Sequence, residues 1–111
     1  MSDSLPEEIS PTALQKTLQE SSLVLIDCRE QDEYDYCHID GAQWIPLGSW
    51  TTQFPHGFPP RDAEVVVYCH HGYRSLRAVR FLRQQGYSRA RSLAGGIEAW
   101  SLQVDPSICR Y

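Results

Sequence analysis

The chain has 111 residues, of which 41% are hydrophobic and 22% charged, and its formal net charge is −4. This length predicts a single domain over residues 1–111, large enough to bury a hydrophobic core. The acidic balance gives no basic surface for nucleic acid or for an anionic membrane, so we expect neither as a partner.

The first residues and the cysteines predict the compartment. Residues 1–8 are polar and acidic, without the basic and apolar regions of a secretory signal, and no stretch is long and apolar enough to cross a membrane. The four cysteines form no CxxC pair, so we expect reduced thiols and a cytoplasmic location. We also expect a monomer, with residues 1–8 and 104–111 as peripheral tails.

The amino-terminal part predicts two helices and two strands. Ser10 suits a helix N-cap and the proline after it suits the first turn, so a helix is expected over Pro11–Glu20. The apolar run Leu23–Ile26 predicts a buried strand. Glu30–Tyr36 is expected to form one or two helical turns, and Trp44–Ile45 a short strand.

Residues 48–62 form the least regular stretch. Their many prolines and glycines limit a helix to a turn or two near Ser49–Gln53. The stretch contains three large aromatic residues: Trp50, Phe54 and Phe58. We expect these rings to pack beneath the loop, although they could instead line the entrance to a site at Cys69.

A buried strand and a helix flank Cys69. Val65–Tyr68 is a continuous apolar run of the kind that is buried on both faces of a parallel sheet. Apolar residues then recur at helical spacing to about Gln85: Leu76, Val79 and Leu82. Cys69 is therefore expected at the carboxyl end of a strand, facing the amino end of a helix, where anions bind and a nucleophilic thiolate is favoured.

The carboxyl-terminal part predicts one more strand. It lies within Tyr87–Leu93 and is followed by a tight turn at Gly95–Gly96, whereas Leu102–Tyr111 has no clear period. Strands that alternate with helices indicate an α/β fold, in which a parallel sheet has helices on both faces.

Three stretches resemble the rhodanese-like sulfurtransferases. Cys69–Ser75, with the sequence Cys-His-His-Gly-Tyr-Arg-Ser, is similar to their active-site loop. Asp27–Arg29 followed by His38–Pro46 matches their Asp-x-Arg, His-Ile-x-Gly-Ala and Ile-Pro pattern, and Leu93–Trp100 matches Leu-x-Gly-Gly-Ile-x-Ala-Trp. The resemblance covers roughly Ile9–Trp100. It implies a rhodanese-like three-layer sandwich with a small parallel five-stranded sheet.

The resemblance also implies sulfur transfer through a persulfide on Cys69. The thiolate would take a sulfane sulfur from thiosulfate or another persulfide and pass it to cyanide or a thiol. The expected partners are small sulfur-containing anions or thiols, or a sulfur-relay protein, and no cofactor is expected. Loop amides would stabilise the anionic sulfur, so the binding loop comprises His70, His71, Gly72, Tyr73, Arg74 and Ser75.

Several side-chain roles stay open at this stage. Arg74 could add positive charge near the sulfur, but bracing of the loop against Asp27 or Glu33 is favoured. The two histidines could bind an anionic donor or deliver a proton, or simply be exposed while their backbone acts. The classical thiosulfate:cyanide enzymes often carry cationic residues at these positions, so thiosulfate could be a test donor rather than the physiological one. The supporting residues considered are Asp27, Arg29 and Arg77.

The other cysteines are expected to be bystanders. Cys28 and Cys37 are interpreted as core or near-core thiols. Cys109 is interpreted as solvent-facing, with a resolving thiol near Cys69 as the alternative. The cysteines and histidines lack structural zinc spacing, so no metal is expected.

Two other functions compete with sulfur transfer. Cys-based phosphatases, and with them arsenate-reductase-like enzymes, use a loop with five residues between cysteine and arginine, whereas four separate Cys69 from Arg74. The shorter loop makes a tighter cradle, which favours a single sulfur over a tetrahedral oxyanion. A non-catalytic module that binds a partner is the other alternative, and the intact cysteine loop argues against it.

Overall fold

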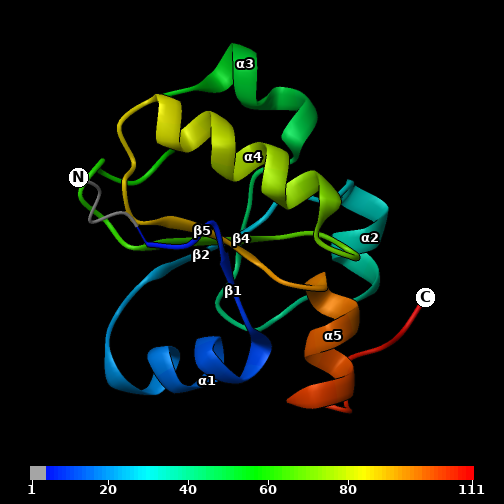
Figure 1. The fold of residues 1–111 in the computed structure, drawn as a ribbon. Coiled ribbons are helices and arrows are strands. Elements are labelled where there is room, and N and C mark those ends of the chain that lie inside the picture. Colours follow the sequence, from blue (N-terminus) through cyan, green and yellow to red (C-terminus); the bar gives the residue numbers. More distant parts are fainter. Residues whose placement is uncertain (1–4) are drawn as a thin grey trace.

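The computed structural model describes residues 5–111, which form three layers around a parallel sheet (Figure 1). The strand order is β1-β5-β4-β2-β3, and every pairing is parallel. The strands are Glu8–Ile9 (β1), Val24–Asp27 (β2), Gln43–Trp44 (β3), Val65–Tyr68 (β4) and Ala90–Leu93 (β5). The predicted α/β sandwich with a parallel five-stranded sheet is confirmed.

Helices cover both faces of this sheet (Figure 1). They are Pro11–Glu20 (α1), Gln31–Tyr36 (α2), Trp50–Gln53 (α3), Tyr73–Gln84 (α4) and Gly96–Gln103 (α5). A 3₁₀ turn, Leu47–Ser49, leads into α3. The predicted start of α1 is confirmed, because the Ala13 N–H donates to Ser10 Oγ at 3.2 Å and proline occupies the first turn. No helix within residues 5–111 is long and apolar enough to cross a membrane.

The central strand β4 is buried on both faces and divides the core in two. Val65, Val66 and Val67 are each 0% exposed, and full burial of such a side chain stabilises the fold by roughly 1.5–3 kcal/mol. The cluster beneath α3 and α4 includes Ile26, Val67, Trp50, Val79 and Leu82. The cluster beneath α1 and α5 includes Leu14, Leu25, Val66, Ile97 and Trp100.

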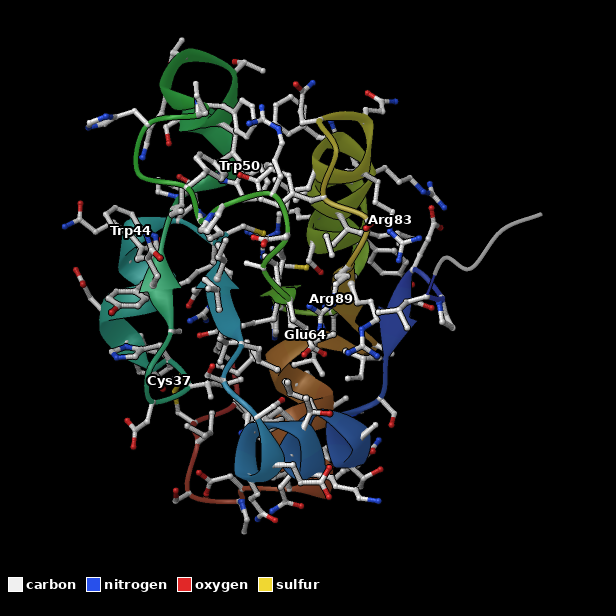
Figure 2. The ribbon with its side chains drawn as sticks, turned by 90° about the vertical axis from the view of Figure 1, so that its left-hand side faces the viewer. Cys37, Trp44, Trp50, Glu64, Arg83 and Arg89 are labelled. Atoms are coloured by element: carbon white, nitrogen blue, oxygen red, sulfur yellow. A yellow bond between two sulfur atoms is a disulfide. The ribbon has the colours of Figure 1, made fainter. Side chains whose placement is uncertain are left out.

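The irregular stretch after β3 packs its aromatic rings against α4. Trp50 lies edge-on to Phe58 and Phe81 at centroid distances of 5.0 and 6.1 Å, and Phe54 lies 5.3 Å from Phe81. Trp50 is 1% exposed, and its indole N–H donates to Ile45 O at 2.8 Å. Packing rather than a site entrance is therefore the role of these rings. Figure 2 shows Trp50 on the side of the sheet that α3 and α4 cover.

The structure adds two elements that the periodicity does not predict. Strand β1 has two residues, too few for any alternation to show, and it places Glu8 beside Ser92 of β5. Helix α5 begins at two consecutive glycines, which disfavour a helix on propensity alone. Of the predicted amino-terminal tail, residues 1–4 lie outside the described residues, and Glu8 belongs to the sheet.

Candidate active site

Cys69 lies at the carboxyl edge of the sheet, directly after the central strand β4. Parallel pairing sets Asp27 of β2 beside Tyr68 of β4, and the Cys28 N–H donates to Tyr68 O at 3.1 Å. Cys28 and Cys69 therefore leave neighbouring strands at the same edge. Cys69 is 1% exposed and has a free thiol.

Backbone N–H groups surround the sulfur of Cys69. The N–H of Gly72 donates to Cys69 Sγ at 3.1 Å and that of Ser75 at 3.4 Å, while Ser75 Oγ lies 3.5 Å from the sulfur. Gly72 is the N-cap of α4 with a φ of 102°, a left-handed conformation that lets the chain turn back over the sulfur. These donors and the positive end of the helix dipole can stabilise an anionic sulfur.

A buried pair of hydroxyls fixes the inner side of the loop. Ser75 and Ser92 are each 0% exposed, and their Oγ atoms lie 2.7 Å apart. The Ser75 hydroxyl also lies 3.3 Å from Gly72 O, which it can reach as a donor. Ser92 of β5 was not among the residues predicted from the sequence, because its place beside the loop depends on the pairing of β4 with β5.

Arg74 points to helix α2. Its Nη1 and Nη2 donate to Glu33 Oε1 and Oε2 at 2.8 and 3.0 Å. This hydrogen-bonded pair lowers the pKa of Glu33 to about 2 and raises that of Arg74. Of the two interpretations of Arg74, the structure therefore favours the brace, with Glu33 rather than Asp27 as the partner.

Helix α5 holds the loop from its other side. The amides of Ile97 and Glu98 donate to the carbonyls of Cys69 and His70 at 2.9 and 3.1 Å. A side chain at Gly96 would collide with those same two carbonyls. Gly96 also has a φ of 64°, so the glycine is required both by the close approach and by the turn.

Asp27 and Arg29 form a buried ion pair near the loop. Both side chains are 0% exposed, and Arg29 Nε and Nη2 donate to the two Asp27 carboxylate oxygens at 2.9 and 2.6 Å. Burial lowers the pKa of Arg29, but its hydrogen bonds to Asp27 outweigh this effect and the net pKa is raised. Arg29 also donates to Cys37 O at 2.6 Å. Arg29 of this pair therefore braces the end of α2.

The remaining predicted residues lie in different surroundings. His70 stacks against His71 with 3.9 Å between ring centroids, and burial followed by the charge of His71 lowers the pKa of His70. Tyr73, within the loop, is 81% exposed. Arg77 is exposed and faces away to a shallow cavity of about 220 Å³, which is also lined by Leu47, Trp50, Thr51 and Phe81.

The expectation of reduced thiols is wrong at two positions. Cys37 and Cys109 form a disulfide across 72 residues of sequence, so Cys37 is not a free core thiol and Cys109 is neither a bystander nor a thiol able to resolve Cys69. No local motif brings these two residues together; the fold does, at the end of α2. Cys28 is a buried free thiol as predicted, and burial raises its pKa.

Tyr111 is a second residue that sequence reasoning missed. Its ring stacks on His70, and its hydroxyl contacts Arg29 and Glu33. The last residues therefore lie against the loop, whereas the sequence predicts a peripheral tail. The Cys37–Cys109 disulfide is the physical reason for this position of the last residues, and no sequence periodicity predicts that disulfide.

Two features of the described residues could provide an alternative to this site: a metal cluster or a second cavity. Among residues 5–111, no group of three or more His, Cys, Asp or Glu side chains could hold a metal ion. A cavity of about 340 Å³ lies at the opposite end of the strands and has no cysteine or histidine in its lining. Its floor includes Glu64 and Arg89, which Figure 2 shows side by side.

Comparisons with known proteins agree with the geometry. A family model described as Rhodanese-like domain matches residues 10–103. The probable adenylyltransferase/sulfurtransferase MoeZ of Mycobacterium tuberculosis is 38% identical over 93% of this chain and 26% of its own length. A protein named Sulfurtransferase from Allochromatium vinosum is 35% identical over 85% of this chain and 87% of its own length. The chain spans between a quarter and about half the length of several such relatives.

Solved structures share the fold. The human single-domain sulfurtransferase TSTD1 superimposes with a TM-score of 0.78 and 25% sequence identity, over 89% of this chain and 98% of that one. The similarity thus extends over nearly the whole of both chains.

Proposed function

The chain belongs to the rhodanese-like domain family, and we propose that it is a sulfurtransferase that works through a persulfide on Cys69. The Cys69 thiolate bonds to the outer sulfur of thiosulfate, the bond to the sulfite sulfur breaks, and sulfite leaves. A nucleophilic acceptor then bonds to the transferred sulfur. With cyanide the product is thiocyanate, and the thiolate is restored.

The observation that carries this proposal is the set of donors around Cys69 Sγ. The amides of Gly72 and Ser75 lie at 3.1 and 3.4 Å, at the amino end of a 12-residue helix. A persulfide keeps its negative charge on the outer sulfur, one bond further out, where the same ring of amides can stabilise it. His70 and His71 are proposed to take part in this loop chiefly through their backbone.

The engagement of Arg74 supports sulfur transfer over phosphate chemistry. Both of its terminal nitrogens bind Glu33, so its fork of donors is already occupied. A phosphate dianion at the loop would therefore lack the two terminal nitrogens of Arg74 as hydrogen-bond donors. A single sulfur anion needs no more than the loop amides, because its charge is smaller and sits on one atom.

The relatives suggest which partners this chain has. MoeZ is named both adenylyltransferase and sulfurtransferase, which suggests that this chain can also serve in a sulfur relay with another protein's thiol as donor or acceptor. Within this proposal the whole chain is one domain that acts as a monomer in the cytoplasm, on small sulfur-containing anions or thiols. Cell fractionation and sedimentation would test the location and the oligomeric state.

Thiocyanate production from thiosulfate and cyanide tests the proposed activity. We expect wild type to produce thiocyanate and Cys69→Ser to produce none above the uncatalysed rate. Cys28→Ala is the matched control, since it removes the other free thiol and should retain activity. Undiminished activity in Cys69→Ser would refute the proposal, as would failure of wild type with both thiosulfate and a glutathione persulfide donor.

A further inference from the structure

The last residue, Tyr111, lies on the sulfur-binding loop, Cys69–Ser75. The Tyr111 ring is nearly parallel to that of His70, with 3.9 Å between centroids and 12° between planes. His70 stacks against His71 as well, so it lies between two rings. Figure 1 shows the end of the chain running from α5 along the side of the molecule where α2 lies.

The Tyr111 hydroxyl links this segment to the braces of the loop. It accepts a hydrogen bond from Arg29 Nη1 at 2.7 Å and donates one to Glu33 Oε2 at 2.8 Å. Glu33 is the carboxylate that holds Arg74. Burial raises the pKa of Tyr111 to about 12, so the hydroxyl keeps the proton that it donates. Tyr111 therefore reaches the loop directly through His70 and indirectly through Glu33.

A disulfide fixes the segment in this place. Cys37 ends α2, and its bond to Cys109 sets Tyr111 two residues from a covalent anchor. Besides the contacts of Tyr111, the segment has an ion pair of Arg110 with Glu98, at 2.6 Å, between side chains that are 60% and 20% exposed. Such an exposed pair contributes little. The segment has no helix or strand of its own, and the disulfide is the covalent bond that ties it to the end of α2.

We propose that Tyr111 is a positioning residue for the sulfur-binding loop, and that the Cys37–Cys109 disulfide is the redox-sensitive anchor that keeps it in place. This deepens the proposed function and rests on it for the meaning of the loop. A dithiol reductant transfers two electrons and two protons to the disulfide, which gives two cysteine thiols, while the reductant itself becomes a disulfide. Tyr111 then leaves His70, and the loop around Cys69 loosens.

Alkylation of Cys69 by iodoacetamide tests this without any sulfur transfer. The rate is followed by peptide mass spectrometry, which separates Cys69 from Cys37 and Cys109. We expect Cys69 in Tyr111→Ala, in Cys109→Ser and in wild type reduced and desalted to react about fivefold faster than in oxidised wild type, in keeping with the strength of an aromatic stack. Leu102→Ala is the control, since it removes an exposed side chain (61% exposed) from α5.

The titration of His70 separates positioning from general loosening. Tyr111 and His71 stack on its ring, and the charged groups that act on its pKa besides His71 are Glu33, Glu98 and Arg74. In NMR titrations, we expect the pKa of His70 to rise toward its ordinary value in Tyr111→Ala and in the reduced protein. Tyr111→Phe keeps the ring and loses only the hydroxyl, so it should keep the lowered pKa.

The outcomes are decisive in both directions. Faster alkylation with a raised His70 pKa, absent from Leu102→Ala, would establish the role of Tyr111. Equal alkylation rates in oxidised, reduced and Tyr111→Ala protein, or an unchanged His70 pKa in Tyr111→Ala, would overturn it. The alkylation comparison stands even where thiosulfate adds no sulfur to wild type, so failure of the proposed function is seen separately.

Discussion

At the scale of single residues, the loop depends on side chains that never touch the sulfur. Both terminal nitrogens of Arg74 donate to Glu33, and Arg29 forms a fully buried ion pair with Asp27. These ion pairs attach the loop and β2 to α2. They therefore position the amides around Cys69 indirectly, without contacting the sulfur. A protein amide that is already oriented needs no reorganisation when negative charge arrives on the sulfur.

Replacement of Glu33 by glutamine should therefore weaken the fold in a pH-dependent way. The folded-state pKa of Glu33 is about 2, below its ordinary 4.5, so the ion pair stabilises the folded protein above pH 4.5 and this contribution is lost as the pH falls toward 2. We expect Glu33→Gln to unfold with a free energy about 1 kcal/mol lower at pH 7, the size of a partly exposed ion pair.

Urea unfolding at pH 7, 5 and 3 measures this difference. The gap between wild type and Glu33→Gln should narrow at pH 3, because Glu33 is then protonated in the unfolded wild type, below its ordinary pKa of 4.5, and the ion pair contributes less to stability. Glu20→Gln, at an exposed carboxylate of α1, is the control and should show no such narrowing. A constant gap at all three pH values would contradict the role given to Glu33.

At the scale of elements, the site exists because β4, α4 and α5 meet at one edge of the sheet. Helix α4 supplies amides that point at the Cys69 sulfur, and α5 supplies amides that bind the Cys69 and His70 carbonyls. The amide donors of the seven-residue loop Cys69–Ser75 are thus positioned by α4, and its carbonyl acceptors are held by α5. The Gly95–Gly96 turn allows this approach, since both glycines have positive φ.

Substitution of Gly96 by alanine should damage the loop. The new Cβ would meet the carbonyls of Cys69 and His70 and would require a strained φ, which together should lower the free energy of unfolding by about 2–4 kcal/mol. Thiocyanate production should fall at least in parallel. Gly48→Ala is the control, because no atom lies within 4 Å of a Cβ there. Equal stability and activity in the two variants would contradict the close approach of α5.

Sequence patterns predict the strand and the helix that flank Cys69, but they do not predict the elements and contacts that pack around the loop. The apolar run of β4 and the 3.6-residue period of α4 place Cys69 correctly, because each pattern is local and long enough to show. The short strand β1, the helix that follows two glycines and the contact of Ser75 with Ser92 depend on tertiary pairing. The roles of the loop residues themselves stay predictions.

At the scale of the whole molecule, the Cys37–Cys109 disulfide joins the middle of the chain to its last residues. It ties α2, which carries Glu33, to the segment that carries Tyr111. Disulfides are rare in the reducing cytoplasm, and those that occur there are often transient. In the proposed cytoplasmic location, we therefore expect the Cys37–Cys109 pair to follow the redox state of its surroundings.

Loss of this disulfide should lower the global stability. A cross-link across 72 residues restricts the unfolded chain, and such bonds typically contribute about 2–4 kcal/mol. We expect this decrease in the free energy of urea unfolding, both for Cys109→Ser and for wild type kept in a dithiol. Cys109→Ser treated with the same reductant is the control and should not change further. Identical unfolding of oxidised and reduced wild type would argue against a disulfide in the folded protein.

The central claim, that Cys69 carries the sulfur, is tested most directly by intact-protein mass spectrometry under non-reducing conditions after treatment with thiosulfate. Wild type and Cys28→Ala should each gain one sulfur, about 32 Da, which cyanide removes as the covalent mechanism requires. Cys69→Ser should gain none. The same gain in Cys69→Ser, or sulfur that maps to Cys28, would contradict the assignment of Cys69 as the residue that carries the persulfide.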